Sequence, residues 1–263
     1  MDLELRGKNV LVTGASKGIG LACANGFAAE GCNVHIAARS ETLLDAARAQ
    51  MMQQYGVEVV CHACDLGVTA NVVALASACG DIDILVNNAG AIPSGRIDEV
   101  DNERWRHGWD LKVFGYINLA REVYADMRGR GRGVIVNVIG LAGERNRSNY
   151  IAGSSGNAAL MAFTRALGAE SVDHGIRVVG VNPGRVETER QIKHMKEAAE
   201  KKFGDPARWP EIVAQVSQTL PFKRSGRPDE VADLVVYLAS ARASYISATV
   251  VTIDAGQSLR ARA

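Results

Sequence analysis

The sequence lacks the features that mark membrane, secreted and nucleic-acid-binding proteins. No apolar run approaches the roughly 18 residues that a membrane-spanning helix needs. The formal net charge is only +1, from 30 basic and 29 acidic side chains, so no polyelectrolyte partner is indicated. The residues after Met1 have neither the basic region nor the apolar region of a signal peptide. We therefore expect a protein that binds neither membranes nor nucleic acids.

Cysteine is scarce, and its spacing indicates no disulfide framework. The five cysteines are an odd number, which favours a reducing, cytoplasmic location. Cys61 and Cys64 have a C-x-x-C spacing, but they fall in an expected strand. Positions three apart on a strand face opposite sides of the sheet, so the two thiols cannot easily share one ion. We therefore predict core packing here and no metal site.

What the chain does contain is a regular alternation of apolar, β-branched runs with alanine-rich helical segments. The expected strands are residues 9–13, 33–38, 57–63, 82–87, 133–138, 176–181 and 248–254. The expected helices are residues 18–30, 41–54, 69–79, 102–127, 151–174 and 228–239. Strands alternating with helices predict right-handed βαβ units, and strands that are apolar throughout predict helices on both faces. We expect an α/β fold: a doubly wound, parallel seven-stranded sheet in a single domain over residues 1–263.

The alternation breaks after Gly184. Residues 187–220 are charged and helical in pattern, and Lys193 and Lys201 are interspersed with acids such as Glu197. Such a face is usually solvated, and an acidic or CoA-linked substrate is the less favoured interpretation. We expect this segment to form a flap over the substrate site.

A glycine-rich turn joins the first expected strand to the first helix. The run from Val10 to Gly20 includes Thr13-Gly-Ala-Ser-Lys-Gly-Ile-Gly20. Glycines allow positive φ and a close approach of the backbone to a ligand, and a helix N-terminus offers free N–H groups to phosphates. A strand, a glycine turn and a helix in this order are typical of a dinucleotide-binding site.

Two further motifs follow the ends of later strands. They are Asn87-Asn-Ala-Gly90 and Asn182-Pro-Gly-Arg-Val-Glu-Thr188. Together with the glycine turn, they resemble the TGxxxGIG, NNAG and PG-x-V-x-T motifs of the short-chain dehydrogenase/reductase family. The resemblance covers nearly the whole chain and implies a Rossmann-like domain that binds a nicotinamide dinucleotide for oxidoreduction. Each motif lies at the carboxyl end of an expected strand, where open α/β sheets bind ligands.

The choice between the two nicotinamide cofactors depends on the residue after the second strand. An Asp or Glu there would bind the ribose 2′-hydroxyl of NAD. The sequence instead has Arg39, which can hold a 2′-phosphate, and Lys17 adds a second cation. We therefore expect NADP(H) rather than NAD(H), although Arg39 could also be a solvated strand end. The expected cofactor contacts are Gly14, Ser16, Lys17, Gly18, Ile19, Gly20, Arg39, Asp65, Leu66, Asn88, Ala89, Gly90, Lys112, Asn157, Pro183, Gly184 and Val186.

The family's catalytic Ser, Tyr, Lys and Asn are all replaced. By the resemblance, their positions are occupied here by Gly140, Gly153, Asn157 and Lys112, respectively. The Lys and Asn look exchanged between two helices, so the site would keep one cation and one amide. A cation near a phenol or the cofactor ribose would still lower the pKa of a proton donor.

Tyr150 is the best replacement for the missing proton donor. It lies three residues before Gly153, so on a helix it would share the same face. A phenol is long enough to enter part of the space that glycine leaves vacant. Tyr150 could instead precede the helix, or pack at a subunit contact. Ser154 and Ser155 are alternative hydroxyls for orienting the substrate, although serines near a helix start more often cap the helix.

These residues predict an NADP(H)-dependent oxidoreductase that acts on a carbonyl, an alcohol or an activated double bond of a small organic substrate. Lys112, Tyr150 and Asn157 would form an atypical proton relay. The alternative is a nucleotide-binding pseudoenzyme that serves as a sensor or structural subunit. The resemblance also implies a homodimer or homotetramer.

Overall fold

One parallel sheet of seven strands organises the molecule. The computed structural model describes residues 2–260. The strands are β1 (Asn9–Thr13), β2 (Asn33–Ala38), β3 (Val59–Ala63), β4 (Ile84–Asn87), β5 (Gly133–Val138), β6 (Ile176–Pro183) and β7 (Thr249–Ile253). They lie in the order β3-β2-β1-β4-β5-β6-β7, and every neighbouring pair is parallel. The predicted fold class is confirmed, with β3 and β4 each beginning two residues later than expected.

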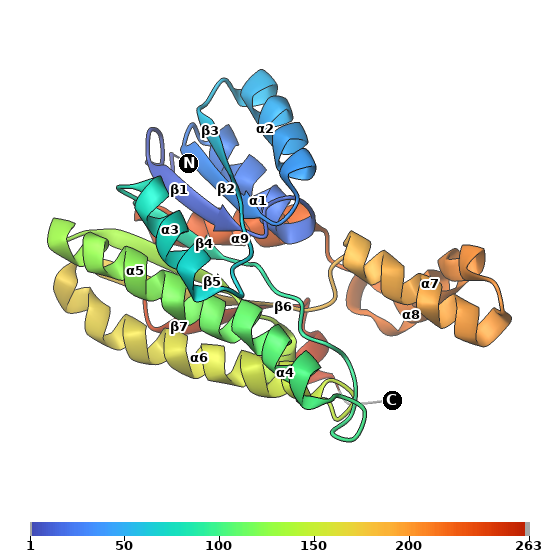
Figure 1. The fold of residues 1–263 in the computed structure, drawn as a ribbon. Coiled ribbons are helices and arrows are strands. Elements are labelled where there is room, and N and C mark those ends of the chain that lie inside the picture. The colour runs from blue at the N-terminus through green and yellow to red at the C-terminus, as the bar shows by residue number, and fades with distance from the viewer. Residues whose placement is uncertain (1, 261–263) are drawn as a thin grey trace.

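Helices cover both faces of this sheet (Figure 1). One face carries α1 (Gly18–Ala29), α2 (Glu41–Tyr55) and α9 (Pro228–Ala239), and the other carries α3 (Thr69–Cys79), α5 (Gly115–Arg130) and α6 (Ile151–Ser171). Alternate residues of β1 enter the two cores: Val10 and Val12 pack towards α1 and α9, and Leu11 packs towards α3 and α5. This alternation explains why most positions of the central strands are apolar.

The long helix expected over residues 102–127 is divided by a π-helical turn. Helix α4 (Asn102–Trp109) is followed by five π-helical residues (Asp110–Phe114) and then by α5. The Asp101 side chain accepts a hydrogen bond from the backbone N–H of Arg104 at 2.8 Å and caps the start of α4. Helix α5 reaches Arg130 and ends at Gly131 in the left-handed conformation, three residues beyond the expected end of the helix at residue 127.

The charged segment after β6 forms a helical hairpin that projects from the sheet (Figure 1). Helix α7 (Glu189–Phe203) and α8 (Trp209–Thr219) pack through a small apolar cluster that includes Met195 and Ile212. The Thr188 hydroxyl caps α7 by accepting from the backbone N–H of Gln191 at 3.3 Å. This hairpin occupies most of the segment predicted as a flap.

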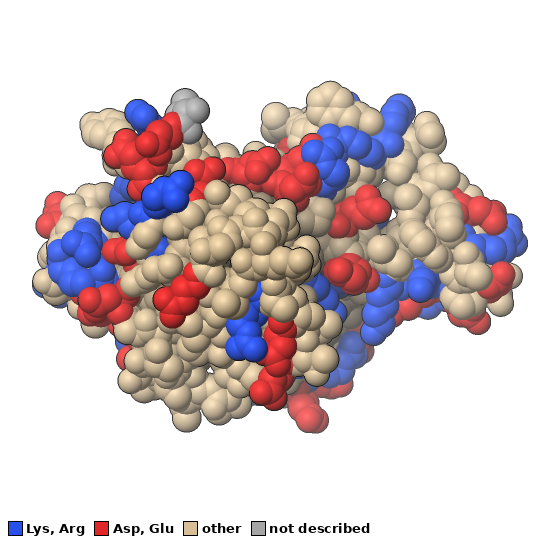
Figure 2. Space-filling model, turned by 90° about the horizontal axis from the view of Figure 1, so that it is seen from above, with Lys and Arg blue, Asp and Glu red and all other residues tan. Residues whose placement is uncertain are grey.

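The charged side chains are interspersed over the surface. Figure 2 shows Lys and Arg next to Asp and Glu on the visible face, without an extended area of one sign. Within residues 2–260, no helix combines the length and the apolarity that crossing a membrane requires.

Candidate functional site

A cleft of about 530 Å³ opens at the carboxyl ends of the central strands. It lies where the strand order reverses between β1 and β4, the place where doubly wound sheets bind nucleotides. Most of the expected cofactor contacts line it: Gly14, Ser16, Lys17, Gly18, Ile19, Arg39, Leu66, Asn88, Ala89, Gly90, Lys112, Pro183, Gly184 and Val186. Four other expected site residues do not line the cleft in the described part of the chain: Gly20, Asp65, Tyr150 and Asn157.

The glycine turn has the geometry of a phosphate cradle. Gly14 and Gly18 have φ values of +65° and +57°, which side chains rarely adopt. A Cβ added at Gly20 would overlap the carbonyl oxygen of Gly14, so Gly20 lets α1 begin close against the turn. Lys17, the residue before α1, makes no side-chain cap, which leaves the first N–H groups of the helix for a ligand in the cleft.

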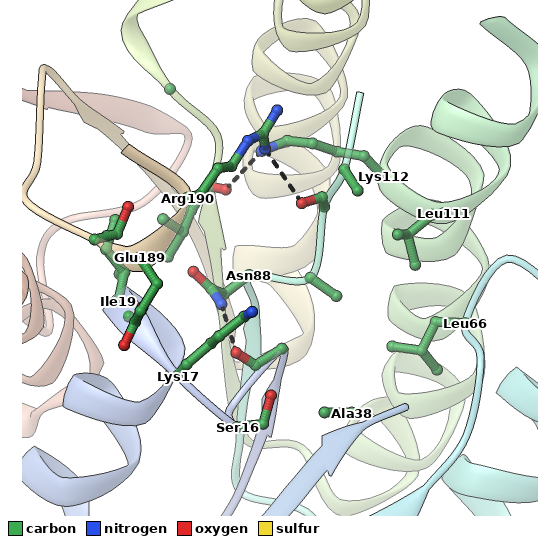
Figure 3. A pocket seen from close by; sticks show the side chains of 18 of the residues that line it. Ser16, Lys17, Ile19, Ala38, Leu66, Asn88, Leu111, Lys112, Glu189 and Arg190 are labelled. Atoms are coloured by element: carbon green, nitrogen blue, oxygen red, sulfur yellow. Dashed lines mark hydrogen bonds between the residues drawn. The ribbon is translucent and has the colours of Figure 1, made fainter. Parts of the chain in front are cut away.

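The Asn88 loop is fastened directly to this turn. The Thr13 hydroxyl accepts from the backbone N–H groups of Asn88 and Ala89 at 2.9 and 3.1 Å. The Asn88 side-chain amide donates to the Thr13 carbonyl at 3.0 Å and to the Gly14 carbonyl at 3.3 Å, and Figure 3 shows Asn88 hydrogen-bonded to the turn. Asn88 therefore holds the ends of β1 and β4 in register as one wall of the cleft.

Two unpaired cations lie at the nucleotide end of the cleft. Lys17 and Arg39 are exposed, and neither forms an ion pair within the part of the chain that the structure describes. Asp65 instead turns its carboxylate to the backbone N–H of Gly67 at 2.9 Å, and α3 is preceded by Val68. The carboxyl group of Asp65 thus stabilises a turn and does not cap α3.

The π-helical turn carries Lys112 to the opposite end of the cleft. Its Nζ donates to the carbonyl oxygen of Ile139 at 2.7 Å and lies 5.6 Å from the ring centroid of Tyr116. Burial, together with the positive charge of Arg190, lowers the pKa of Lys112 from its usual 10.5 to about 7. Figure 3 shows Lys112 and Arg190 extending towards each other from opposite walls.

Tyr150 lies over Gly153, the glycine that we expect at the position of the family's tyrosine. It precedes α6 as its N-cap residue, with φ −146° and ψ 42°, and is therefore not on the helix. Its ring nevertheless covers Gly153, because a Cβ added at Gly153 would overlap ring atoms Cε1 and Cζ of Tyr150. The Tyr150 ring can therefore lie here only because residue 153 has no side chain.

Asn157 is buried behind the loop that follows β5. Its Nδ2 donates to the carbonyl oxygen of Gly140 at 3.2 Å, and its Oδ1 is buried without a partner in the described residues. Gly140 has a φ of +127°, so a serine at this position would be strained. Asn157 therefore contacts the cleft through Gly140, which lines it, rather than directly.

The sequence analysis missed three residues of this region. Tyr116 is buried one helical turn after Lys112, and its hydroxyl donates to the Val138 carbonyl at 2.9 Å. Burial, with a smaller effect of Tyr150, holds the pKa of Tyr116 well above its usual range. Arg190 and Glu189 reach the cleft from α7. The i, i+4 spacing from Lys112 could have indicated Tyr116. The α7 residues follow the third motif, but no local pattern gives their direction.

Arg190 ties α7 to the loop after β4. Its Nη2 donates to the Ile92 carbonyl at 2.9 Å and its Nη1 to the Gly90 carbonyl at 3.4 Å. The projecting hairpin is thereby connected to the rim of the cleft.

Comparisons with known proteins agree with this architecture. A family model described as short chain dehydrogenase matches residues 8–199. L-Sorbose reductase from Gluconobacter frateurii, solved with NADPH and L-sorbose, superposes with a TM-score of 0.93 at 34% identity, covering 99% of this chain and 100% of that one. A 7α-hydroxysteroid dehydrogenase solved with NADH has a TM-score of 0.84 at 29% identity, with coverages of 97% and 96%.

Among curated proteins, the chain is similar to galactitol 2-dehydrogenase (L-tagatose-forming) from Cereibacter sphaeroides. The two are 32% identical over 258 residues, which is 96% of each chain. Because the family model spans most of the chain and the relatives align over nearly all of it, the protein belongs to the short-chain dehydrogenase/reductase family of NAD(P)-dependent oxidoreductases.

Proposed function

We propose that the protein is an NADP(H)-dependent oxidoreductase that interconverts an alcohol and a carbonyl on a small organic substrate through an atypical proton relay. The observation that carries the proposal is that one cleft holds both a phosphate cradle at Gly14–Gly20 and, at its far end, a half-buried lysine whose pKa is lowered to about 7. The first substrates to examine are ketoses and polyols, because L-sorbose reductase and galactitol 2-dehydrogenase are similar over nearly the whole chain.

The preference for NADP(H) rests on Lys17 and Arg39. Both cations are unpaired among the described residues and line the cleft, Lys17 from the turn after β1 and Arg39 directly after β2, so a 2′-phosphate would find two positive partners. Relatives are divided, since the sorbose reductase structure holds NADPH and the hydroxysteroid dehydrogenase structure holds NADH. When bound, the nicotinamide would supply or accept a hydride at the substrate carbon.

In the proposed relay, the Tyr150 hydroxyl gives a proton to the substrate oxygen during reduction and takes it back during oxidation. Lys112, with a pKa of about 7, can hold or release a proton at Nζ at neutral pH. The unpaired Oδ1 of Asn157 offers an acceptor for a water that would link the site to solvent.

Replacing Tyr150 with Phe tests the relay. We expect kcat for carbonyl reduction to fall by about 10²–10⁴, the usual contribution of a general acid, while the Kd for NADPH stays within about twofold. Tyr245→Phe is the matched control, because Tyr245 is fully exposed and remote from the described lining of the cleft. A Tyr150→Phe variant with the wild-type kcat would eliminate Tyr150 as the proton donor.

A further inference from the structure

Three potential metal ligands meet outside the cleft, from three separate elements. His35 lies on β2, His62 on the edge strand β3 and Cys79 at the end of α3 (Figure 1). Nδ1 of His35 is 3.0 Å from Nε2 of His62, and Sγ of Cys79 is 3.6 Å from that same nitrogen. All three ligand atoms lie within 4.8 Å of one another. The proposed oxidoreductase reaction uses none of them.

The separations match those around a tetrahedral ion. With zinc bonds of about 2.0–2.1 Å to nitrogen and about 2.3 Å to sulfur, two ligand atoms at tetrahedral angles stand roughly 3.3–3.6 Å apart. The two distances to His62 Nε2, 3.0 and 3.6 Å, are close to these values. The third separation, between Nδ1 of His35 and Sγ of Cys79, is at most 4.8 Å. An ion would therefore bind after side-chain shifts of up to about 1 Å.

The fold holds the three side chains on one face of the sheet. Ala37 of β2 is paired with His62 of β3, so His35 is the neighbour two positions along on the same face. The imidazole rings stack with centroids 5.2 Å apart and an interplanar angle of 12°. Cys79 is buried in the core between this face and α3. Cys61, one residue from His62, packs into the core on the opposite face.

The donor set suits a borderline transition ion. Two imidazoles and a thiolate are ligands that zinc prefers, whereas calcium and magnesium require oxygen. The thiol of Cys79 loses its proton to solvent as the metal–sulfur bond forms. Both histidines are only half-buried, which gives an ion a path of entry.

We propose that His35, His62 and Cys79 bind a zinc ion, with water in the fourth position. The ion would join the edge strand β3 to β2 and to α3. It would replace the hydrogen bond between the two imidazoles and leave the residues of the cleft unchanged.

Cobalt(II) titration of the full chain, first treated with a chelator, tests the proposal. We expect one equivalent of Co²⁺ to produce a thiolate-to-cobalt charge-transfer band and the intense visible bands of a four-coordinate ion. Cys79→Ser should abolish the charge-transfer band, and His62→Gln should weaken Co²⁺ binding by about tenfold or more. Cys61→Ser is the matched control and should keep the full spectrum. The Cys61 thiol lies on β3 next to His62, but on the opposite face of the sheet from the proposed site.

Thermal unfolding with Zn²⁺ provides a second measurement that needs no enzymatic activity. At a hundredfold excess of Zn²⁺ over its Kd, we expect Tm to rise by roughly 5–10 °C in the wild type and Cys61→Ser. No comparable rise should occur in His35→Gln, a variant that keeps the buried thiol in place. Absence of the charge-transfer band in the wild type, its persistence in Cys79→Ser, or an equal Tm rise in His35→Gln would overturn the proposal.

Discussion

The surroundings of Lys112 strongly lower the pKa of its ammonium group. Its Nζ faces two backbone carbonyls and the ring of Tyr116, and no carboxylate contacts it in the described structure. Desolvation without a counter-charge explains a pKa near 7 for a group that ordinarily titrates at 10.5. At neutral pH, Lys112 is therefore a group that can both hold and release a proton.

The pH dependence of activity should report this group. Because reduction consumes a proton, we expect log kcat/KM for reduction to decrease as the pH rises through about 7, with the opposite trend for oxidation. Lys112→Met should remove this inflection and lower kcat/KM by about 10–100-fold. Lys193→Met, which changes an exposed lysine of α7, should retain the inflection.

The pH dependence of stability gives an independent measurement on the same residue. Between about pH 7 and 10.5 the unfolded chain binds more protons at Lys112 than the folded chain, so the free energy of unfolding should increase with pH there. The upper limit is about 5 kcal/mol over this interval, and Lys112→Met should flatten the slope. Equal slopes in denaturant unfolding of the two proteins would contradict the lowered pKa.

Arg39 tests the cofactor preference at the same scale. We expect Arg39→Asp to weaken NADPH binding by about 10–100-fold, because a charge-assisted contact to the 2′-phosphate is lost, while NADH binding changes little. Isothermal titration with both nucleotides measures the two effects. Arg48→Asp, on the exposed side of α2, is the control. Equal weakening of NADPH and NADH would refute the assignment of Arg39 to the 2′-phosphate.

The sequence predicted some of these residue positions because they depend on local backbone chemistry. The turn from Gly14 to Gly20 requires glycines at fixed places, and the structure has it as expected. The position of the Tyr150 ring could not be predicted from the sequence. Tyr150 lies outside the helix, and only its dihedral angles and the vacant space at Gly153 bring the ring there.

At the scale of elements, strands and most helices followed from periodicity, whereas the π-helical turn did not. Residues 110–114 contain neither proline nor glycine, and a π turn differs from an α-helix only in the pairing of its hydrogen bonds. This turn nevertheless carries Lys112, and such turns frequently accompany functional sites. The His35–His62–Cys79 cluster was missed because its members come from three elements.

The hydrogen bonds of Arg190 connect helix α7 to the rim of the cleft, and this connection can be measured. Arg190→Ala removes its hydrogen bonds to the Ile92 and Gly90 carbonyls. We expect backbone amides of α7 to exchange about tenfold faster, the low end for hydrogen bonds from a charged donor. Hydrogen–deuterium exchange with Lys193→Ala as control measures this. Unchanged exchange in Arg190→Ala would mean that Arg190 does not hold α7.

For the whole molecule, the order of strands and helices was readable because each βαβ unit repeats the same pattern. The sheet order then brings motifs near residues 14, 88 and 184 to one edge. The domain limits, the role of the hairpin as a flap and assembly into a homodimer or homotetramer stay predictions. Sedimentation of the purified protein would test the last.

The central claim is that this chain turns over its cofactor although we expect other residues at the positions of the family's usual catalytic residues. The most direct measurement is oxidation of NADPH by the purified protein with a panel of ketoses, including L-sorbose, other small ketones and activated alkenes. We predict substrate-dependent oxidation at about 1 s⁻¹ or faster with at least one carbonyl compound, and a slower rate with NADH. A protein whose Tm rises with NADPH but that reduces no member of the panel would contradict the account and indicate a nucleotide-binding protein without turnover.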